Sequence, residues 1–243
     1  MIKLVALLLL AFAIDDCRSE EDITVEEARR TLSYLASDEM EGREPGNPGN
    51  FIAVSFIRKE FESYGLETHL QTFTYAFRER VGFFRWRTIR IEVMNVVGVL
   101  KGTSDKHVVI GAHMDHLGLD GDGNAYNGAD DNASGTTAIL ELAEAFGKSD
   151  TKPKDTIVFI AFNAEELGLL GSKHYVNNPL LPLDDCKLMI NLDMVGRLRG
   201  TTVTAQGGNL SRSVTQLVDK LDDDYPFDVN ITAAGNRSDH APF

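Results

Sequence analysis

The stretch from Gly111 to Gly135 (GAHMDHLGLDGDGNAYNGADDNASG) constrains the fold more than any other part of the chain. A short apolar run leads into His113 and Asp115, and in an extended strand two side chains at this spacing point the same way. A loop rich in Gly and Asp follows, with Asp131 near its end and Ser134, a residue type favoured at helix N-caps, before the next apolar segment. The stretch therefore predicts that an imidazole and carboxylates meet at the mouth of a strand, as they do in metal sites.

Apolar segments of strand type and of helix type alternate along most of the chain. Alternating or continuous apolar runs predict strands, and a period of 3.6 residues between capping signals predicts helices. We expect strands at 67–75, 89–100, 107–112, 156–162 and 187–193, and helices at 25–35, 48–65, 134–146 and 167–176. The alternation predicts an α/β fold, a three-layer α/β/α sandwich around a mostly parallel mixed sheet with helices on both faces.

Two of these helices begin with clear capping signals. Thr24 with Glu27 three residues later forms a capping box, and Asn47 followed by Pro48 marks the start of the second helix. The acidic residues between the two helices, at positions 38, 39 and 41, are interpreted as a solvated loop. A segment rich in Arg and Phe at 76–87 has a charge balance opposite to that of the rest of the chain, and we expect it to form a hairpin or an edge excursion.

The net charge of −13 limits the partners that the chain can bind. Of its 243 residues 43% are apolar and 25% are charged, which suits one large α/β domain. Binding to nucleic acid or to anionic lipid requires a basic surface, which such a charge disfavours. The basic and aromatic segment at 76–87 is of a type that stacks on bases, but it belongs to an acidic protein. We therefore expect no nucleic-acid partner and no stable membrane insertion, and the oligomeric state stays open.

The first thirteen residues (MIKLVALLLLAFA) have the pattern of a secretory signal peptide that ends in a small-x-small cleavage site. Their apolar run of about ten residues is too short to span a bilayer. We therefore expect an exported protein, periplasmic or extracellular, whose residues 14–243 form a single domain. A lipoprotein anchor on Cys17 is the alternative, disfavoured by the Ile-Asp-Asp sequence before it. A disulfide between Cys17 and Cys186 and a pair of free thiols both remain open.

Further acidic residues follow two other predicted strands. Glu165 and Glu166 come directly after one apolar run, and Asp193 follows the next. Because open α/β sheets build their sites at the carboxyl ends of strands, these side chains can converge with those of the first stretch, joined by His240 from a later loop. Taken alone, a Glu-Glu pair is commonly the solvated start of a helix, and an Asp at the end of a strand is commonly part of a turn or a cap. A site is favoured because all of these residues are placed at the ends of strands or in the loops that follow them. The histidines interpreted as surface or packing residues are His69, His107, His116 and His174.

The chain resembles the secreted co-catalytic zinc aminopeptidases, a metallopeptidase family that also holds glutamate carboxypeptidases and glutaminyl cyclases. The resemblance runs from Leu32 to the end and rests on the motifs LSYLASDEMEGR, AHMDH, NGADDNASG, FNAEELGLLGS, NLDMVGR and SDHAPF. It implies a zinc-exopeptidase-like fold, with 14–243 as the catalytic domain. Because the family generally continues for several tens of residues beyond the position of His240, it also implies that the last strand and helix are missing here.

This resemblance gives each candidate residue a role. The implied ligands of two co-catalytic Zn²⁺ ions are His113 and Asp193 on one ion, Glu166 and His240 on the other, and Asp131 bridging both. Asp115 would orient His113, and Glu165 would be the general base towards a water held by the two ions. The family also carries a cis peptide after the bridging Asp, which here is the bond between Asp131 and Asn132. Independently, mixed His and carboxylate ligands without Cys suit zinc, or manganese and cobalt as substitutes.

The implied function is that of a zinc-dependent aminopeptidase, which hydrolyses N-terminal residues from peptides. Its substrates would be peptide or protein N-termini, because a free α-amino group can bind one zinc ion. The alternatives are another reaction on the same scaffold, namely carboxypeptidase, dipeptidase or glutaminyl cyclase, and a truncated relative that binds without catalysis. Cyclases of this kind use one zinc ion, and non-catalytic relatives typically lose ligands, none of which is lost here.

Overall fold

The computed structural model describes residues 23–198, 200–207, 212, 214–216 and 228–243. The predicted signal peptide lies outside the described residues. So does Cys17, the possible disulfide partner of Cys186. The elements are α2 (Val25–Leu35), η1 (Asp38–Arg43), α3 (Pro48–Ser63), β1 (Glu67–Arg80), β2 (Trp86–Leu100), β3 (His107–His113), η2 (Ala129–Ala133), α4 (Ser134–Gly147), β4 (Thr156–Phe162), α5 (Leu170–Asn177), η3 (Leu183–Asp185), β5 (Cys186–Asn191), β6 (Thr202–Gln206) and β7 (Asp228–Thr232).

A five-stranded mixed sheet forms the centre of the fold, in the order β1-β2-β4-β3-β5. β4 and β5 both pair with β3 in parallel, whereas β2 is antiparallel to β1 and to β4. Within this sheet β2 therefore runs against the other four strands. The prediction of an α/β fold around a mixed, mostly parallel sheet is confirmed.

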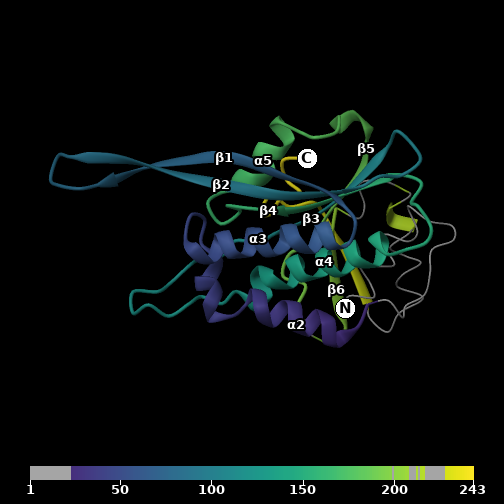
Figure 1. Cartoon of the computed structure of the whole chain (residues 1–243), viewed down its shortest axis with the longest axis horizontal. Coiled ribbons are helices and arrows are strands. Elements are labelled where there is room, and N and C mark those ends of the chain that lie inside the picture. Colours follow the sequence, from purple (N-terminus) through teal and green to yellow (C-terminus); the bar gives the residue numbers. More distant parts are fainter. Residues whose placement is uncertain (1–22, 199, 208–211, 213, 217–227) are drawn as a thin grey trace.

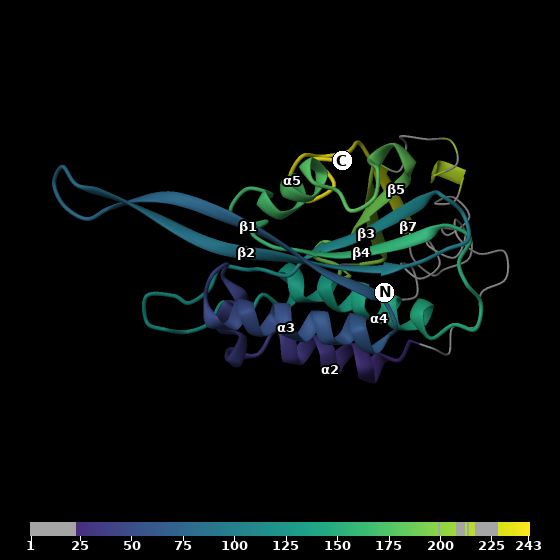
Figure 2. The same ribbon diagram turned by 45° about the horizontal axis from the view of Figure 1, so that its top comes forward.

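Helices cover both faces of the sheet, as Figures 1 and 2 show: α2, α3 and α4 lie on one side and α5 lies on the other. The larger apolar cluster fills the space between the sheet and α3 and α4, and it includes Phe61, Ile139 and Phe159. A smaller cluster beneath α5 includes Phe162 and Tyr175. Every residue of β3 and β4 is buried, which explains why these central strands read as continuous apolar runs. The predicted three-layer arrangement is thus confirmed.

The starts of α2 and α3 confirm the capping predictions. The Thr24 hydroxyl accepts a hydrogen bond from the Glu27 N–H at 3.2 Å, and the Asn47 side chain accepts one from the Asn50 N–H at 2.8 Å. Each bond satisfies a backbone donor that has no partner within its own helix. Neither these helices nor the others among the described residues combine the length and the apolar character that a membrane crossing needs.

Several element boundaries differ from the sequence prediction. α5 begins at Leu170 rather than at 167, because Gly168 and Leu169 have φ values of 101° and 60°, which a right-handed helix excludes. β5 ends at Asn191, so Asp193 lies just beyond the strand. In addition, β6 and β7 form a separate two-stranded parallel sheet that the sequence pattern did not predict.

The predicted hairpin at 76–87 is confirmed, and its strands are longer than expected. β1 and β2 stay paired out to Arg80 and Trp86, with a tip at 81–85. β4 pairs with β2 only over 96–100, so the outer part of β1 and β2 is a two-stranded ribbon that projects from the body (Figure 1). Because β2 runs against β4, this ribbon leaves the sheet at the end where β3 and β4 finish.

Glu141 is a buried acid in the middle of α4. The residue is 4% exposed, and the Thr31 hydroxyl of α2 donates a hydrogen bond to its carboxylate at 3.3 Å. Burial, followed by the charge of Glu144, raises the pKa of Glu141 from 4.5 to about 7. Between these two pH values the folded chain binds more protons than the unfolded chain, so stability falls as the pH rises.

Replacing Glu141 by glutamine is expected to raise the free energy of unfolding by about 1–2 kcal/mol at pH 8, because the amide has no charge to bury. At pH 5 the gain should be smaller, since the wild-type carboxyl is then largely protonated in the folded chain. Urea denaturation at the two pH values measures the difference. Glu92→Gln, on an exposed part of β2, is the control, and an equal gain from Glu141→Gln at both pH values would contradict the prediction.

Candidate metal centre

Three of the predicted residues meet at the carboxyl ends of β3 and β5. His113 is the last residue of β3, Asp131 lies in the η2 turn before α4, and Asp193 follows β5. The His113 Nε2 atom lies 3.3 Å from Asp131 Oδ1 and 3.5 Å from Asp193 Oδ1. One ligand atom from each residue can therefore reach a common metal ion.

A second group of possible ligands shares Asp131 with the first. Its other members are His116 and Glu166, and His116 Nδ1 lies 2.8 Å from Glu166 Oε1. The sequence analysis interpreted His116 as a surface or packing residue, whereas the structure places it in the candidate metal centre. A signal was available, because His116 directly follows Asp115 in the segment just after β3.

His240 belongs to neither of these two groups in the described part of the chain. Its Nε2 atom lies 3.0 Å from the carbonyl oxygen of Gly235. Its loop nevertheless touches the centre, because the Ser238 hydroxyl donates a hydrogen bond to Asp193 at 2.6 Å. The ligand role of His240 stays a prediction, and the structure offers His116 as a second candidate.

Asp115 holds the loop that carries the two glutamates. Its carboxylate is fully buried and accepts hydrogen bonds from the backbone N–H groups of Glu165 at 3.1 Å and Glu166 at 3.3 Å. The His113 Nδ1 atom lies 3.2 Å from the backbone oxygen of Asp115 and 3.8 Å from its carboxylate. A proton on Nδ1 would donate a hydrogen bond to that backbone oxygen. The lone pair of Nε2 is then available to bind a metal ion.

The turn that carries Asp131 is fixed by the side chain of Asn132. The peptide bond between the two residues is cis, as the resemblance implied. The Asn132 amide donates to the carbonyl oxygen of Leu192 at 2.9 Å, and its oxygen accepts from the N–H of Gly135 at 2.9 Å. Asn132 therefore caps the first turn of α4. The predicted cap, Ser134, is instead the first residue of that helix.

The electrostatics of the centre favour a cation. Burial alone would lower the pKa of His113, but hydrogen bonds to Asp131 and Asp193 outweigh it and raise the pKa well above its usual value. Asp239, which lies between Ser238 and His240 in the loop that contacts the centre, is fully buried, and burial raises its pKa to about 7. A proton on His113 offsets part of the negative charge of Asp131 and Asp193, and a divalent cation bound by these three residues would displace it. Since both groups combine His with carboxylates and contain no Cys, the residues fit zinc.

Glu165 lies beside the two groups without belonging to either. Burial raises the pKa of this half-buried carboxyl to about 8; His113 opposes the rise, and the negative charges of Asp239 and Asp115 add to it. A carboxylate whose charge is disfavoured binds a proton readily. The position and the raised pKa suit a group that accepts and returns a proton.

Arg43 is a residue of the site that the sequence analysis did not single out. It is 1% exposed and ties the end of α2 to the segments that lead to Asp115 and Asp131. Its guanidinium donates to the backbone carbonyl oxygens of Leu35, Met114, Asn127 and Gly128. Asp38 and Glu39 in the same turn are exposed, as expected for a solvated loop. The available signal was a single Arg at the end of an acidic, turn-rich segment.

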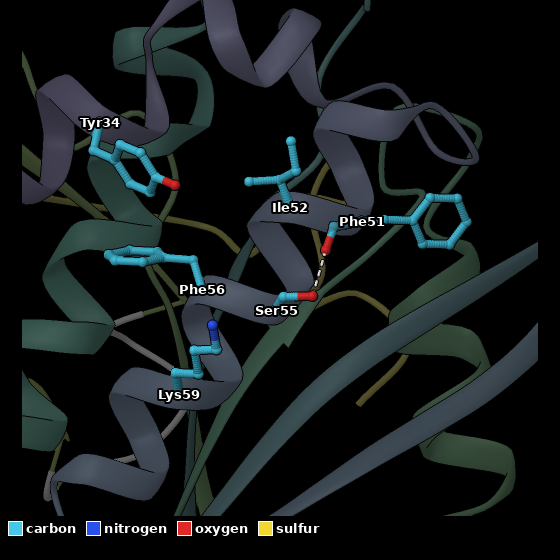
Figure 3. Close-up of a pocket in the computed structure, with 6 residues that line it drawn as sticks. All are labelled: Tyr34, Phe51, Ile52, Ser55, Phe56 and Lys59. Atoms are coloured by element: carbon cyan, nitrogen blue, oxygen red, sulfur yellow. Dashed lines mark hydrogen bonds between the residues drawn. The ribbon is translucent and has the colours of Figure 1, made fainter.

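A shallow pocket of about 320 Å³ lies away from these residues, between α2 and α3. Figure 3 shows its lining, with the rings of Tyr34 and Phe56 close together and the Phe51 ring turned away from them. The Tyr34 and Phe56 rings meet edge to face with centroids 4.9 Å apart. Since none of the candidate ligands or Glu165 lines this pocket, it is not part of the candidate metal centre.

The chain belongs to peptidase family M28, whose model matches residues 95–243. The match spans all the candidate residues from His113 to His240. It confirms the family that the motifs indicated.

Individual relatives agree with this assignment. The chain is 29% identical over 216 residues to leupeptin-inactivating enzyme 1 of Streptomyces exfoliatus, covering 87% of this chain and 44% of that one. It is 37% identical over 160 residues to aminopeptidase YwaD of Bacillus subtilis (strain 168), covering 61% and 32%. The chain thus spans less than half the length of either relative.

Solved structures share the fold. The Legionella pneumophila LapA aminopeptidase superposes with a TM-score of 0.70 at 25% identity, over 99% of this chain and 59% of that one. A glutaminyl cyclase from Porphyromonas gingivalis gives a TM-score of 0.73 at 19% identity, over 90% and 79%. The second likeness concerns the fold alone.

Proposed function

We propose that this chain is a zinc-dependent metallopeptidase that removes N-terminal residues from peptides. The observation that carries the proposal is the pair of candidate metal groups that share Asp131 at the carboxyl edge of the sheet. Many hydrolytic enzymes, aminopeptidases among them, bind two metal ions in one active site. Membership of family M28 and the aminopeptidases among its relatives support the same reaction.

Residues of both groups would hold the metal ions. We assign His113 and Asp193 to one zinc ion, Glu166 to a second, and Asp131 to both. The remaining ligand of the second ion is either His240, from the resemblance, or His116, from its 2.8 Å contact with Glu166. When bound, the ions would supply Lewis acidity to the scissile carbonyl and to the attacking water.

Glu165 then performs the proton transfers. Its carboxylate takes a proton from the attacking water and returns it to the nitrogen of the leaving amine. Asp115 keeps Glu165 and Glu166 in position, because both oxygens of its carboxylate accept hydrogen bonds from their backbone N–H groups. The same carboxylate therefore serves the proposed base and a proposed ligand together.

Removal of metal is expected to abolish hydrolysis of peptides with a free N-terminus. Incubation with 1,10-phenanthroline should lower the rate by about 100-fold or more, and Zn²⁺ should restore it, because the carboxylates and imidazoles alone do not activate the carbonyl. The substrates are a leucine-initiated tetrapeptide and its N-acetylated form, followed by mass spectrometry. We expect cleavage of the free peptide only, since the acetyl group removes the amine that would bind zinc.

The same assay separates the alternatives. A peptide that begins with glutamine would lose ammonia, without release of an amino acid, if the chain were a glutaminyl cyclase. Release from the carboxyl end would indicate a carboxypeptidase. Metal binding without turnover of any peptide would indicate a non-catalytic relative. The export predicted from residues 1–13 would place the proposed activity on peptides outside the cytoplasm.

A further inference from the structure

The outer part of β1 and β2 forms a ribbon without a third strand among the described residues. We term residues 75–91 the hairpin arm, and Figure 1 shows it projecting from the body. An isolated two-stranded ribbon is only marginally stable in water. The far end of this one exposes Phe83 by 79%, Phe84 by 87% and Trp86 by 57%. Large aromatic side chains gathered in water in this way mark an interaction surface.

The tip of the hairpin arm is ordered by its own contacts. Arg80 donates a hydrogen bond to the backbone oxygen of Phe83 at 2.9 Å, and its guanidinium lies 5.6 Å from the centroid of the Phe83 ring. The N–H of Val81 donates to the carbonyl of Arg85 at 3.0 Å. The rings of Phe83 and Phe84 meet edge to face, with centroids 4.7 Å apart. Because the aromatic rings are already positioned, docking would cost little conformational entropy.

The hairpin arm is basic on an acidic protein. Residues 75–91 carry five arginines and one glutamate, and the whole chain has a net charge of −13, so the rest carries −17. Cross-strand pairing places Arg78 opposite Thr88 and Arg90 opposite Ala76, which puts both arginines on one face of the ribbon. Tyr75 and Phe77 point to the other face with their rings stacked, 5.5 Å between centroids. The first face also carries Arg80 opposite Trp86, and on the second face Arg87 pairs with Glu79. The unpaired arginines of the two strands therefore lie on one face, and aromatic side chains lie on both.

The body has a surface of complementary character at the same end of the molecule. We term the η1 turn and the loop 117–128 the acidic rim. The two are joined by a hydrogen bond of 2.8 Å from the Asn127 amide to Asp38. Its acidic side chains are Asp38, Glu39, Glu41, Asp120 and Asp122, and its exposed apolar side chains are Leu117, Leu119 and Tyr126. Acidic and apolar groups are what the hairpin arm requires of a partner.

We propose that the hairpin arm docks on the acidic rim of a second copy of this chain, and that the exchange is reciprocal. Arm and rim lie at the same end of the molecule in Figures 1 and 2, so a two-fold arrangement end to end would bring each arm over the other rim. An arm of about 27 Å by 10 Å, taken from strand spacings, has a footprint of about 270 Å². Two such contacts bury about 1,000 Å² in total, near the lower limit of about 1,200 Å² for stable interfaces. Interfaces of this small size are typical of weak, transient complexes, so we expect association at micromolar concentrations of the chain.

Sedimentation equilibrium of the full chain, from about 5 to 200 µM, measures this association. Phe83→Ser/Phe84→Ser should raise the Kd by about tenfold or more, because buried aromatic side chains contribute most of the binding energy of an interface and this variant removes two of them. Its control is Val25→Ser/Leu180→Ser, which removes two exposed apolar side chains elsewhere. Arg78→Gln/Arg90→Gln should raise the Kd by about fivefold. Its control, Arg29→Gln/Lys152→Gln, changes the net charge by the same amount at exposed sites, so that overall charge repulsion is matched.

Three results would overturn the proposal. One is a wild-type chain that stays monomeric up to about 200 µM. Another is a dimer whose Kd is the same in the arm variants as in their controls, all variants keeping the wild-type melting temperature. The third is a monomer that co-floats with vesicles of phosphatidylglycerol and phosphatidylcholine and loses this binding in Phe83→Ser/Phe84→Ser. The arm would then face lipid rather than a second copy.

Discussion

Replacement of Glu165 by glutamine is expected to lower turnover of unblocked peptides by about 100- to 10,000-fold, the usual contribution of a positioned general base. Glutamine keeps the shape of the side chain and cannot accept the proton of the attacking water. Glu165 belongs to neither candidate metal group, so the zinc content should not change. Steady-state rates on the leucine-initiated tetrapeptide, with zinc measured by atomic absorption, test both parts.

The neighbouring residue provides a matched control for this variant. Glu166→Gln makes the same chemical change one position along the chain, in a member of the second metal group. We expect it to lower the zinc content as well as the rate, whereas Glu165→Gln should lower the rate only. A Glu165→Gln enzyme that turns over at a rate near that of the wild type would remove this residue from the mechanism.

Replacement of Arg43 by methionine is expected to lower the free energy of unfolding by about 3 kcal/mol or more, because each buried acceptor left without a partner costs about 1–3 kcal/mol. The guanidinium is 1% exposed, and it serves four backbone carbonyls from three separate segments. Methionine matches the length of the side chain and donates no hydrogen bond. Urea denaturation monitored by circular dichroism gives the loss.

The control for Arg43 is an arginine on the surface. Arg58 of α3 is half exposed and pairs with Glu62 one turn away, and such pairs contribute little to stability. Arg58→Met should therefore change the free energy of unfolding by less than about 0.5 kcal/mol. If Arg43→Met were as mild as Arg58→Met, Arg43 would not be the tie between α2 and the site segments.

Much of the fold follows from short-range patterns. The order of strands and helices from β3 to β5 could be read from apolar runs, and the starts of α2 and α3 from single capping residues. These signals are local, because a strand or a cap depends on residues within a few positions of each other. Boundaries inside turns were less predictable. The late start of α5 depends on the left-handed backbone at Gly168 and Leu169. Glycine favours this conformation, but a leucine rarely adopts it.

The candidate site was likewise predictable only in part. The residues that end strands, His113 above all, could be proposed because the carboxyl ends of parallel strands meet at one edge of a sheet. Which imidazole faces Glu166 could not, since that depends on how two loops fold. The structure brings His116 to within 2.8 Å of this carboxylate and leaves His240 beside the carbonyl of Gly235.

The sequence alone determined the α/β architecture, the family and a set of acids and histidines at strand ends, because these depend on residue type and on spacing along the chain. Only the tertiary structure decided that His116 contacts Glu166, that Arg43 ties three segments together, and that the hairpin arm projects from the sheet. Each of these depends on distances between segments far apart in the sequence. Such distances are set by the packing of helices on the sheet and by the conformations of loops, which no local pattern encodes.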